Sequence, residues 1–168
     1  EISTQYHLKH TVFDRKKSED LGLGAFLSVN QGSSQEAAFT ILEYQSNIGN
    51  AKTIGLVGKC VLFDTGGISI KGSENLHYMK SDMGGATAVI GTLIAAAEMK
   101  LPVNIIAILP ITDNAISNTA YIPSDVITAY NGKTIEVLNT DAEGRMTLAD
   151  GLSYLVTNYK TNALIDLA

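Results

Sequence analysis

The chain has 168 residues, 45% of them hydrophobic, which suits one domain that buries roughly two thirds of its unfolded surface. A net charge of −5 and the absence of any lysine or arginine cluster argue against nucleic acid as a partner. No apolar run is long enough for a membrane span, no signal peptide opens the chain, and the single cysteine, Cys60, has no disulfide partner, so we expect a cytosolic protein.

The first part of the chain predicts three strands and one short helix. His7–Phe13 has the composition of a strand. Asp14–Leu21 predicts a helix that Asp14 caps and that Gly22 ends. Two apolar runs of strand length follow, Ala37–Tyr44 and Ile54–Phe63, and the second is typical of a central strand covered on both faces.

A long loop and a helix occupy the middle of the chain. The loop spans Asp64–Lys80 and contains glycine and serine. The helix spans about Gly85–Lys100 and is apolar nearly all round, which predicts that it is buried. Pro102 marks its end, a buried strand is expected at Val103–Ile111, and a polar loop at Thr112–Ser124.

The last part of the chain predicts a hairpin, a helix and the start of a strand. Asn131-Gly132 lies between Val126–Tyr130 and Thr134–Leu138, a strong hairpin signal. Met146–Tyr159 has apolar residues at near-helical spacing. Residues 163–168 begin a strand with no turn after it, so we expect a piece of a longer protein. Alternating strands and helices predict a three-layer α/β/α sandwich with a mixed, largely parallel central sheet.

Four carboxylates are predicted to meet at one edge of this sheet. Sites in open α/β sheets gather at the carboxyl ends of strands. Asp64 follows Ile54–Phe63, Asp141 and Glu143 follow Thr134–Leu138, and Asp82 precedes the central helix. Four ionised carboxylates repel one another, so the site needs cations. Two divalent ions about 3.5–4 Å apart, such as Mg, Mn or Zn, would neutralise them in the arrangement usual for hydrolysis.

Three cationic side chains accompany these acids. Lys59 lies inside an apolar run, so it must be paired, neutral or at the strand edge; beside two dications its pKa would fall and its amine could bind metal. Lys71 can polarise a carbonyl, and Arg145 can hold an anion such as bicarbonate. In an extended segment, Asp141, Glu143 and Arg145 would share one side.

Each of these residues also has a purely structural interpretation. Asp82 can cap the helix that follows it, Asp141 can form an Asx turn, and Glu143 can be a solvated acid. Lys59 can be held in a salt bridge, and Lys71 can be exposed. No histidine has a partner at metal-ligand spacing, so no metal role is assigned to His7, His10 and His77.

Three motifs resemble one enzyme family. They are Asn139–Arg145 (NTDAEGR), Val57–Lys71 (VGKCVLFDTGGISIK) and Met79–Gly85 (MKSDMGG). Together they resemble the catalytic domain of the leucyl (cytosol) aminopeptidases, peptidase family M17, and the seven-residue stretch is the signature of that family. The resemblance runs from about Gly22 to Ala168. It implies that residues 1–168 are the N-terminal part of the catalytic domain, without the family's separate N-terminal domain and the end of the catalytic domain.

The resemblance implies a ligand set for two metal ions. Asp82 and Lys59, with Asp64 and Glu143, would bind the readily exchanged metal. Asp64, Asp141 and Glu143 would hold the tighter metal, and Asp64 and Glu143 would bridge the two. The implied cofactors are manganese or zinc, with magnesium as a further choice.

The resemblance also implies an activity. Lys71 would stabilise the tetrahedral intermediate, and Arg145 would position a bicarbonate that acts as general base. Met79 would line the pocket for the first side chain of the substrate, and Asn139 would lie near the substrate backbone. The implied reaction is removal of an N-terminal residue, commonly leucine, from a peptide by a two-metal mechanism, in a protein that assembles as a homohexamer.

Departures from the family pattern are few, but one concerns the substrate pocket. Cys60 stands where the family commonly has glycine, and Gly72 where it commonly has proline. In the family, sequence beyond the position of Ala168 completes the substrate pocket. We therefore expect the parent protein to be active and this chain alone to be weakly active or inactive.

Two other functional classes remain open from the sequence. Phe63-Asp-Thr-Gly-Gly67 contains the Asp-Thr-Gly of aspartic proteases, in which two carboxylates share a proton. A metal-stabilised scaffold or binding module without enzymatic activity is the second alternative. The glycine patterns at Gly22–Ala25 and Gly55–Lys59 lack the full spacing of nucleotide-binding loops.

Overall fold

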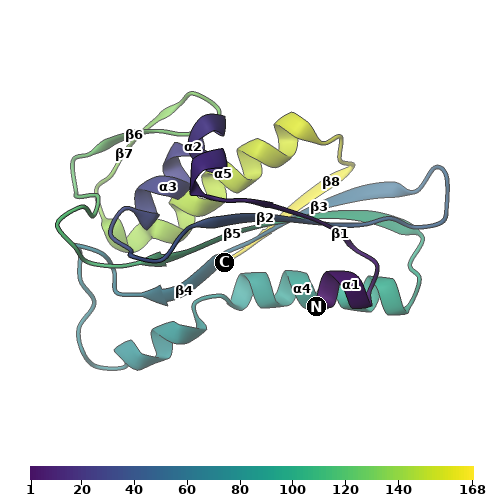
Figure 1. Cartoon of the computed structure of the whole chain (residues 1–168), viewed down its shortest axis with the longest axis horizontal. Helices are drawn as coiled ribbons and strands as arrows, with labels where there is room; N and C mark the ends of the chain where they lie inside the picture. The colour runs from purple at the N-terminus through teal and green to yellow at the C-terminus, as the bar shows by residue number, and fades with distance from the viewer.

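A mixed six-stranded sheet forms the centre of the protein, whose computed structural model describes residues 1–168 (Figure 1). Its strands lie in the order β1-β2-β5-β3-β8, and β4 pairs with the second half of β5. Their bounds are β1 Lys9–Phe13, β2 Ala38–Tyr44, β3 Lys52–Gly58, β4 Cys60–Asp64, β5 Val103–Asn114 and β8 Ala163–Leu167. β3, β4, β5 and β8 pair in parallel, whereas β1 and β2 extend the sheet in antiparallel pairing.

Helices cover both faces of this sheet. One face carries α2, α3, α5 and the β6–β7 hairpin, and the other carries α4 and α1 (Figure 1). The bounds of these elements are α1 Ile2–Gln5, α2 Arg15–Leu21, α3 Gly24–Asn30, α4 Gly84–Glu98, α5 Glu143–Asn158, β6 Val126–Thr128 and β7 Thr134–Glu136. Two short 3-10 helices, η1 Leu76–Ser81 and η2 Thr140–Ala142, precede α4 and α5. The structure therefore confirms the predicted three-layer α/β/α sandwich.

A separate apolar core lies on each side of the sheet. Under α4, Val89 and Leu93 pack on Leu56 and Ala107. Under α3 and α5, the core includes Phe26, Phe39, Val57 and Leu155, and the rings of Phe26 and Phe39 meet edge to face with centroids 5.6 Å apart. Burying a large apolar side chain contributes about 1.5–3 kcal/mol, so these two cores supply most of the stabilisation of the layers.

Two local predictions are confirmed by the backbone. Asp14 caps α2 by accepting a hydrogen bond from the Lys17 amide at 2.7 Å, and Gly22 ends the helix in the left-handed region with φ +78°. The hairpin around Asn131-Gly132 forms as β6 and β7, although both strands are shorter than predicted. The first strand is also shorter, because it begins at Lys9 rather than at His7.

The prediction of one continuous strand over Ile54–Phe63 is wrong, because Lys59 interrupts it. The Lys59 amide donates to the Leu167 carbonyl of β8 at 2.8 Å, and the Lys59 carbonyl accepts from Ala86 of α4 at 2.9 Å. The first turn of α4 crosses very closely here, since a Cβ on Gly58 would lie 2.8 Å from the Ala86 Cα. Close packing of α4 therefore divides the run into β3 and β4.

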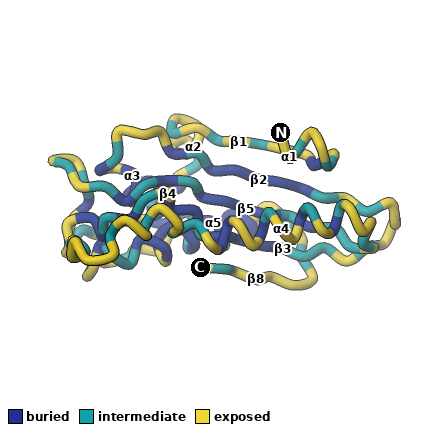
Figure 2. The backbone as a smooth tube through the Cα atoms, turned by 90° about the horizontal axis from the view of Figure 1, so that it is seen from below, coloured by how far each residue is buried: buried dark blue, intermediate teal, exposed yellow.

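The predicted central helix is buried on one face only. Ala86, Val89, Leu93 and Ala96 of α4 are buried, at the spacing of a single helical face. The opposite face is exposed and consists largely of small residues, so it presents little apolar area to solvent. Figure 2 shows this alternation along α4, and it shows β8 as an exposed edge of the sheet. None of the helices has both the length and the apolar character needed to cross a bilayer.

Candidate metal centre

Four acidic and two basic side chains gather at the carboxyl edge of the central sheet. Asp64 ends β4, and Lys59 lies in the break between β3 and β4. Lys71 comes from the loop after β4, Asp82 follows η1, and Asp141 and Glu143 come from η2 and the start of α5. The predicted convergence of the four carboxylates at the end of a central strand therefore occurs.

The elements that carry Asp141 and Glu143 to this edge differ from the predicted ones. The strand before Asp141 and Glu143 is β7, which belongs to the separate two-stranded sheet. Asp141, Glu143 and Arg145 do not share one side of an extended segment, because η2 and the first turn of α5 begin here. Asp141 and Glu143 still face Asp64, whereas Arg145 is exposed and makes no ion pair.

Two lysine ammonium groups connect the acids. Lys59 Nζ lies 2.8 Å from Asp82 Oδ2 and 2.8 Å from Glu143 Oε1. Lys71 Nζ lies 2.8 Å from Asp64 Oδ2 and forms a second ion pair with Asp141. Four carboxylates thus face two ammonium groups, so the cluster keeps two uncompensated negative charges.

Burial makes these charges costly. Asp64 and Glu143 are each only 1% exposed. Burial raises the pKa of Glu143, the negative charge of Asp64 raises it further, and the neighbouring Lys59 acts against both. Burial alone would lower the pKa of Lys59, but its two carboxylate partners outweigh that effect and raise it. The prediction that two dications lower the pKa of Lys59 concerns a metal-loaded site and stays a prediction.

The donor set fits divalent cations. One oxygen each from Asp64, Asp141 and Glu143 lies within 4.8 Å of the others. Asp82 Oδ2 is buried, and its polar neighbour is Lys59 Nζ at 2.8 Å. An excess of negative charge and a set of carboxylate ligands are together suited to hard or borderline cations such as Mg, Mn and Zn.

Local backbone contacts explain how the acids are held. The Val61 amide donates to the Asp82 carbonyl at 3.2 Å, which ties the end of η1 to β4. Asp82 does not cap α4, because Met83 occupies the capping position without a side-chain hydrogen bond. The capping role near Asp141 belongs instead to Asn139, whose side chain accepts a hydrogen bond from the Asp141 amide at 2.8 Å.

Two glycines after Asp64 allow the loop to press against Asp141. Gly66 has φ +86°, and its amide donates to Asp64 Oδ1 at 2.9 Å. A Cβ at Gly66 would lie 2.9 Å from Asp141 Oδ1, and one at Gly67 would lie 2.8 Å from Thr140 Oγ1. Both positions therefore need glycine, since any side chain would displace the loop from the acidic cluster.

A buried polar group that the sequence reasoning missed lies directly behind the acids. Asn114, the last residue of β5, is 1% exposed and donates to Asp64 Oδ1 at 2.8 Å and to the Thr140 carbonyl at 3.1 Å. Tyr121 donates to the same carbonyl at 2.8 Å. No signal in the sequence indicates this contact, because the composition of Thr112–Ser124 predicts a polar loop rather than the end of a strand.

The remaining predicted site residues lie outside the ion-pair cluster. Met79 is partly exposed on η1, and Asn139 is exposed just before η2. Arg145 and Asn139 line a hollow of about 300 Å³ whose other walls include Leu138 and Met146. Ala142, which lies between Asp141 and Glu143 in the sequence, also lines this hollow.

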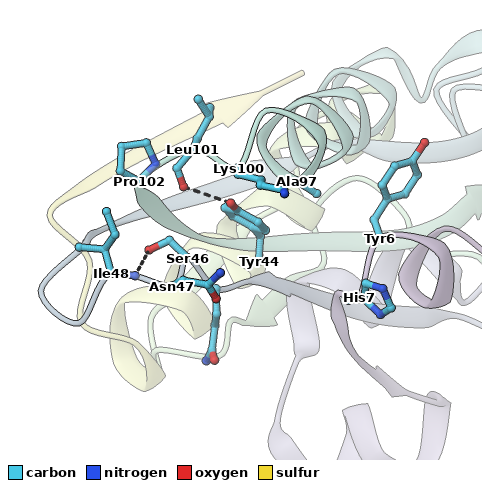
Figure 3. Close-up of a pocket in the computed structure, with 11 residues that line it drawn as sticks. Tyr6, His7, Tyr44, Ser46, Asn47, Ile48, Ala97, Lys100, Leu101 and Pro102 are labelled. Atoms are coloured by element: carbon cyan, nitrogen blue, oxygen red, sulfur yellow. Dashed lines mark hydrogen bonds between the residues drawn. The ribbon is translucent and has the colours of Figure 1, made fainter.

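A second hollow, of about 230 Å³, lies at the other end of β5 (Figure 3). Tyr44 stands at its centre and donates its hydroxyl hydrogen to the Leu101 carbonyl at 3.0 Å. His7 and Lys100 also line it, but none of its lining residues is an aspartate or a glutamate. It therefore offers no carboxylate ligands, in contrast to the acidic cluster at the opposite edge of the sheet.

Comparison with known proteins agrees with this geometry. A family model described as "Cytosol aminopeptidase family, catalytic domain" matches residues 1–168. A protein of Nitrosomonas eutropha named "Probable cytosol aminopeptidase" is 51% identical over the whole chain. Proteins of the same name from Rickettsia massiliae and Chlorobium limicola are 48% and 51% identical over 94% of it.

The matched region is only part of these relatives. The chain spans 34% of the Nitrosomonas eutropha protein and 31% of the Rickettsia massiliae and Chlorobium limicola proteins. The match to the Nitrosomonas eutropha protein nevertheless covers all 168 residues of the chain, and therefore every position of the acidic cluster. The chain belongs to the cytosol aminopeptidase family.

Proposed function

We propose that the protein is a metal-dependent aminopeptidase that removes N-terminal residues, preferably leucine-like ones, from peptides by a two-metal mechanism. The observation that carries this proposal is the buried cluster of four carboxylates and two lysines at the carboxyl edge of the sheet. In this proposal residues 1–168 supply the N-terminal part of the catalytic domain of a longer enzyme.

The proposed ligands divide into two overlapping sets. Asp64, Asp141 and Glu143 would hold one cation, and the mutual approach of their oxygens supports this set. Asp82 and Lys59, with Asp64 and Glu143, would hold the other, and the position of Lys59 Nζ, 2.8 Å from both Asp82 Oδ2 and Glu143 Oε1, supports it. Manganese or zinc, or alternatively magnesium, would suit these ligands. When bound, two such cations supply Lewis-acid polarisation of the scissile carbonyl and activation of water.

Two cationic side chains would serve the reaction directly. Lys71 is held among Asp64 and Asp141, where its ammonium can stabilise negative charge that develops on the carbonyl oxygen. Arg145 has no ion-pair partner and lines a hollow beside the cluster, so its guanidinium donors are free to bind a bicarbonate that accepts a proton. In both roles the charged side chain would act on the reacting groups rather than stabilise the fold.

The substrate would be a peptide that approaches from the exposed side of the cluster. Met79 on η1 would contact its first side chain, and Asn139 would lie near its backbone. We further propose a cytoplasmic homohexamer without nucleic-acid or membrane partners; the location is supported by the word "cytosol" in the names of the relatives. The aspartic-protease alternative is disfavoured, because the ammonium of Lys71 contacts Asp64 and the chain belongs to another family.

The test is an assay of the natural protein that contains this chain, with leucine p-nitroanilide as substrate. Activity should disappear with EDTA and return with manganese. Lys71→Ala and Arg145→Ala should each lower kcat/KM by about 100-fold or more, as expected for removal of a charge that stabilises the transition state. Lys52→Ala, which removes an exposed lysine of β3, serves as the matched control.

Activity that survives EDTA would favour the aspartic-protease alternative. A function of the natural protein that neither Lys71→Ala nor Arg145→Ala alters would favour the non-enzymatic scaffold. Residues 1–168 alone should be weakly active or inactive in the same assay, because the family resemblance places part of the substrate pocket in later sequence. Full activity of this chain alone would refute that part of the proposal while leaving the metal site intact.

A further inference from the structure

The side chain of Asn114 reaches carboxylates of two different elements from behind the acidic cluster. It pairs with Asp64 across the parallel strands β4 and β5. Its Nδ2 atom lies 2.8 Å from Asp64 Oδ1, 3.1 Å from the Thr140 carbonyl oxygen and 3.5 Å from Glu143 Oε2. All three neighbours are hydrogen-bond acceptors, so the donor end of the amide must face them.

The contact with Asp64 separates the two oxygens of that carboxylate. Oδ1 accepts hydrogen bonds from Asn114 and from the Gly66 amide. Oδ2 faces Lys71 Nζ at 2.8 Å and therefore points into the ion-pair cluster. With Oδ1 engaged by two donors, rotation of the carboxylate would break two hydrogen bonds, at about 1 kcal/mol or more for each.

The backbone of Asn114 is itself held firmly. Its carbonyl accepts a hydrogen bond from the Thr65 amide at 3.0 Å and another from the Thr65 hydroxyl at 2.8 Å. The side chain is 1% exposed, so water does not compete for its donors. Asn114 thus links β5, the end of β4 and η2 behind the acidic cluster.

We infer that Asn114 is a positioning residue that fixes the orientation of Asp64 and Glu143 and thereby sets the affinity of the site for divalent cations. This inference rests on the proposed two-metal function. Residues that hydrogen-bond to metal ligands commonly change metal affinity or activity by about 10–100-fold when they are removed. A leucine at this position has the same branched arrangement of side-chain heavy atoms but no donor, so it removes the hydrogen bonds to the carboxylates without adding charge.

Tyr121 provides a matched control, because it donates to the same Thr140 carbonyl but hydrogen-bonds to neither carboxylate. Asn114→Leu and Tyr121→Phe each remove one buried hydrogen bond to Thr140. Only Asn114→Leu also removes the donors to Asp64 and Glu143. If the role of Asn114 were purely structural, the two variants would bind manganese with similar affinity.

The experiment measures manganese binding to the natural protein and its two variants by isothermal titration calorimetry, after EDTA treatment and dialysis. We expect the manganese Kd to rise by about 10–100-fold in Asn114→Leu and by less than 3-fold in Tyr121→Phe. Urea unfolding of the metal-free proteins should show that both variants fold, with the larger loss of stability in Asn114→Leu because this variant also lacks the hydrogen bonds to Asp64 and Glu143.

Equal manganese affinity in both variants would overturn the inference while leaving the metal-dependent activity of the natural protein unaffected. Absence of manganese binding by the unmodified protein would overturn the proposed function and this inference together. If Asn114→Leu does not fold, Asn114→Ser makes the same comparison, because its shorter side chain withdraws the donor from Asp64. An Asn114→Ser protein with unchanged manganese affinity would likewise contradict the inference.

Discussion

Gly144 offers a sharp test of how closely Lys59 must be placed. It is the second residue of α5, directly after Glu143, and it packs against the Lys59 side chain. A Cβ at this position would lie 2.9 Å from Lys59 Cδ, 3.0 Å from Cε and 3.2 Å from Nζ. Ordinary contact between such atoms is about 3.5–4.0 Å, so Gly144→Ala must displace the lysine by roughly 0.5–1 Å.

The displacement should affect function more than stability. Lys59 Nζ holds both Asp82 and Glu143 at 2.8 Å, so its movement disturbs two proposed ligands at once. A misplacement of about 1 Å can cost about 100-fold in rate, and we expect kcat/KM to fall by about 10–100-fold. In stability, the helix preference for alanine, up to about 1 kcal/mol, partly offsets an overpacking cost of about 1–3 kcal/mol.

The assay compares Gly144→Ala with Gly91→Ala. Gly91 lies in α4, and a Cβ there would meet no atom within 4 Å. Gly91→Ala should therefore gain up to about 1 kcal/mol in the free energy of unfolding and leave kcat/KM unchanged. Unaltered kcat/KM and manganese affinity in Gly144→Ala would refute the claim that the position of Lys59 controls the site.

Two further predictions concern buried groups that are not members of the acidic cluster. Asp150 of α5 is fully buried and accepts hydrogen bonds from the amides of Phe26 at 2.9 Å and Tyr130 at 2.7 Å. Asp150→Ala should therefore lower the free energy of unfolding by about 2–5 kcal/mol. A loss below about 1 kcal/mol in urea titrations would contradict this prediction. Burial raises the pKa of Cys60 from 9.0 to about 11, so the unfolded thiol ionises first and stability should fall as pH rises between these values. Cys60→Ala should remove that decline, up to about 2–3 kcal/mol, and an unchanged pH profile would show that the thiol does not cause it.

Short-range signals account for the elements that the sequence predicted well. Asp14 begins α2 and Gly22 ends it, each through contacts within one helical turn. Asn131-Gly132 forms the turn of the hairpin. The alternation of strands and helices was sufficient for the three-layer architecture. In each case the information lies within a few residues of the feature.

Features that depend on distant packing escaped prediction. The seven-residue helix α3 was missed, and the side chain that accepts a hydrogen bond from its Phe26 amide is Asp150, distant in sequence. The break at Lys59 arises where α4 crosses β3, and nothing within the run Ile54–Phe63 indicates it. Asn114 escaped for the same reason, because its place behind Asp64 depends on the pairing of β4 with β5.

The same distinction between local signals and distant packing applies to the residues of the candidate site. The position of Asp64 at a strand end could be predicted from its local sequence, and so could that of Asp82 before a helix. The helical start at Glu143 could not, because the tightly spaced charges of Asn139–Arg145 also fit an extended segment. The difference affects Arg145, which is exposed and lines the hollow of about 300 Å³.

The most direct test of the central claim is the number of divalent cations that the natural, metal-free protein binds. Titration with manganese in the calorimeter should give two ions for each chain, and Asp64→Asn should abolish binding of at least one. Asp20→Asn, which alters an exposed acid of α2, should bind as the unmodified protein does. No binding, or binding that Asp64→Asn leaves unchanged, would contradict the assignment of the acidic cluster as a two-metal site.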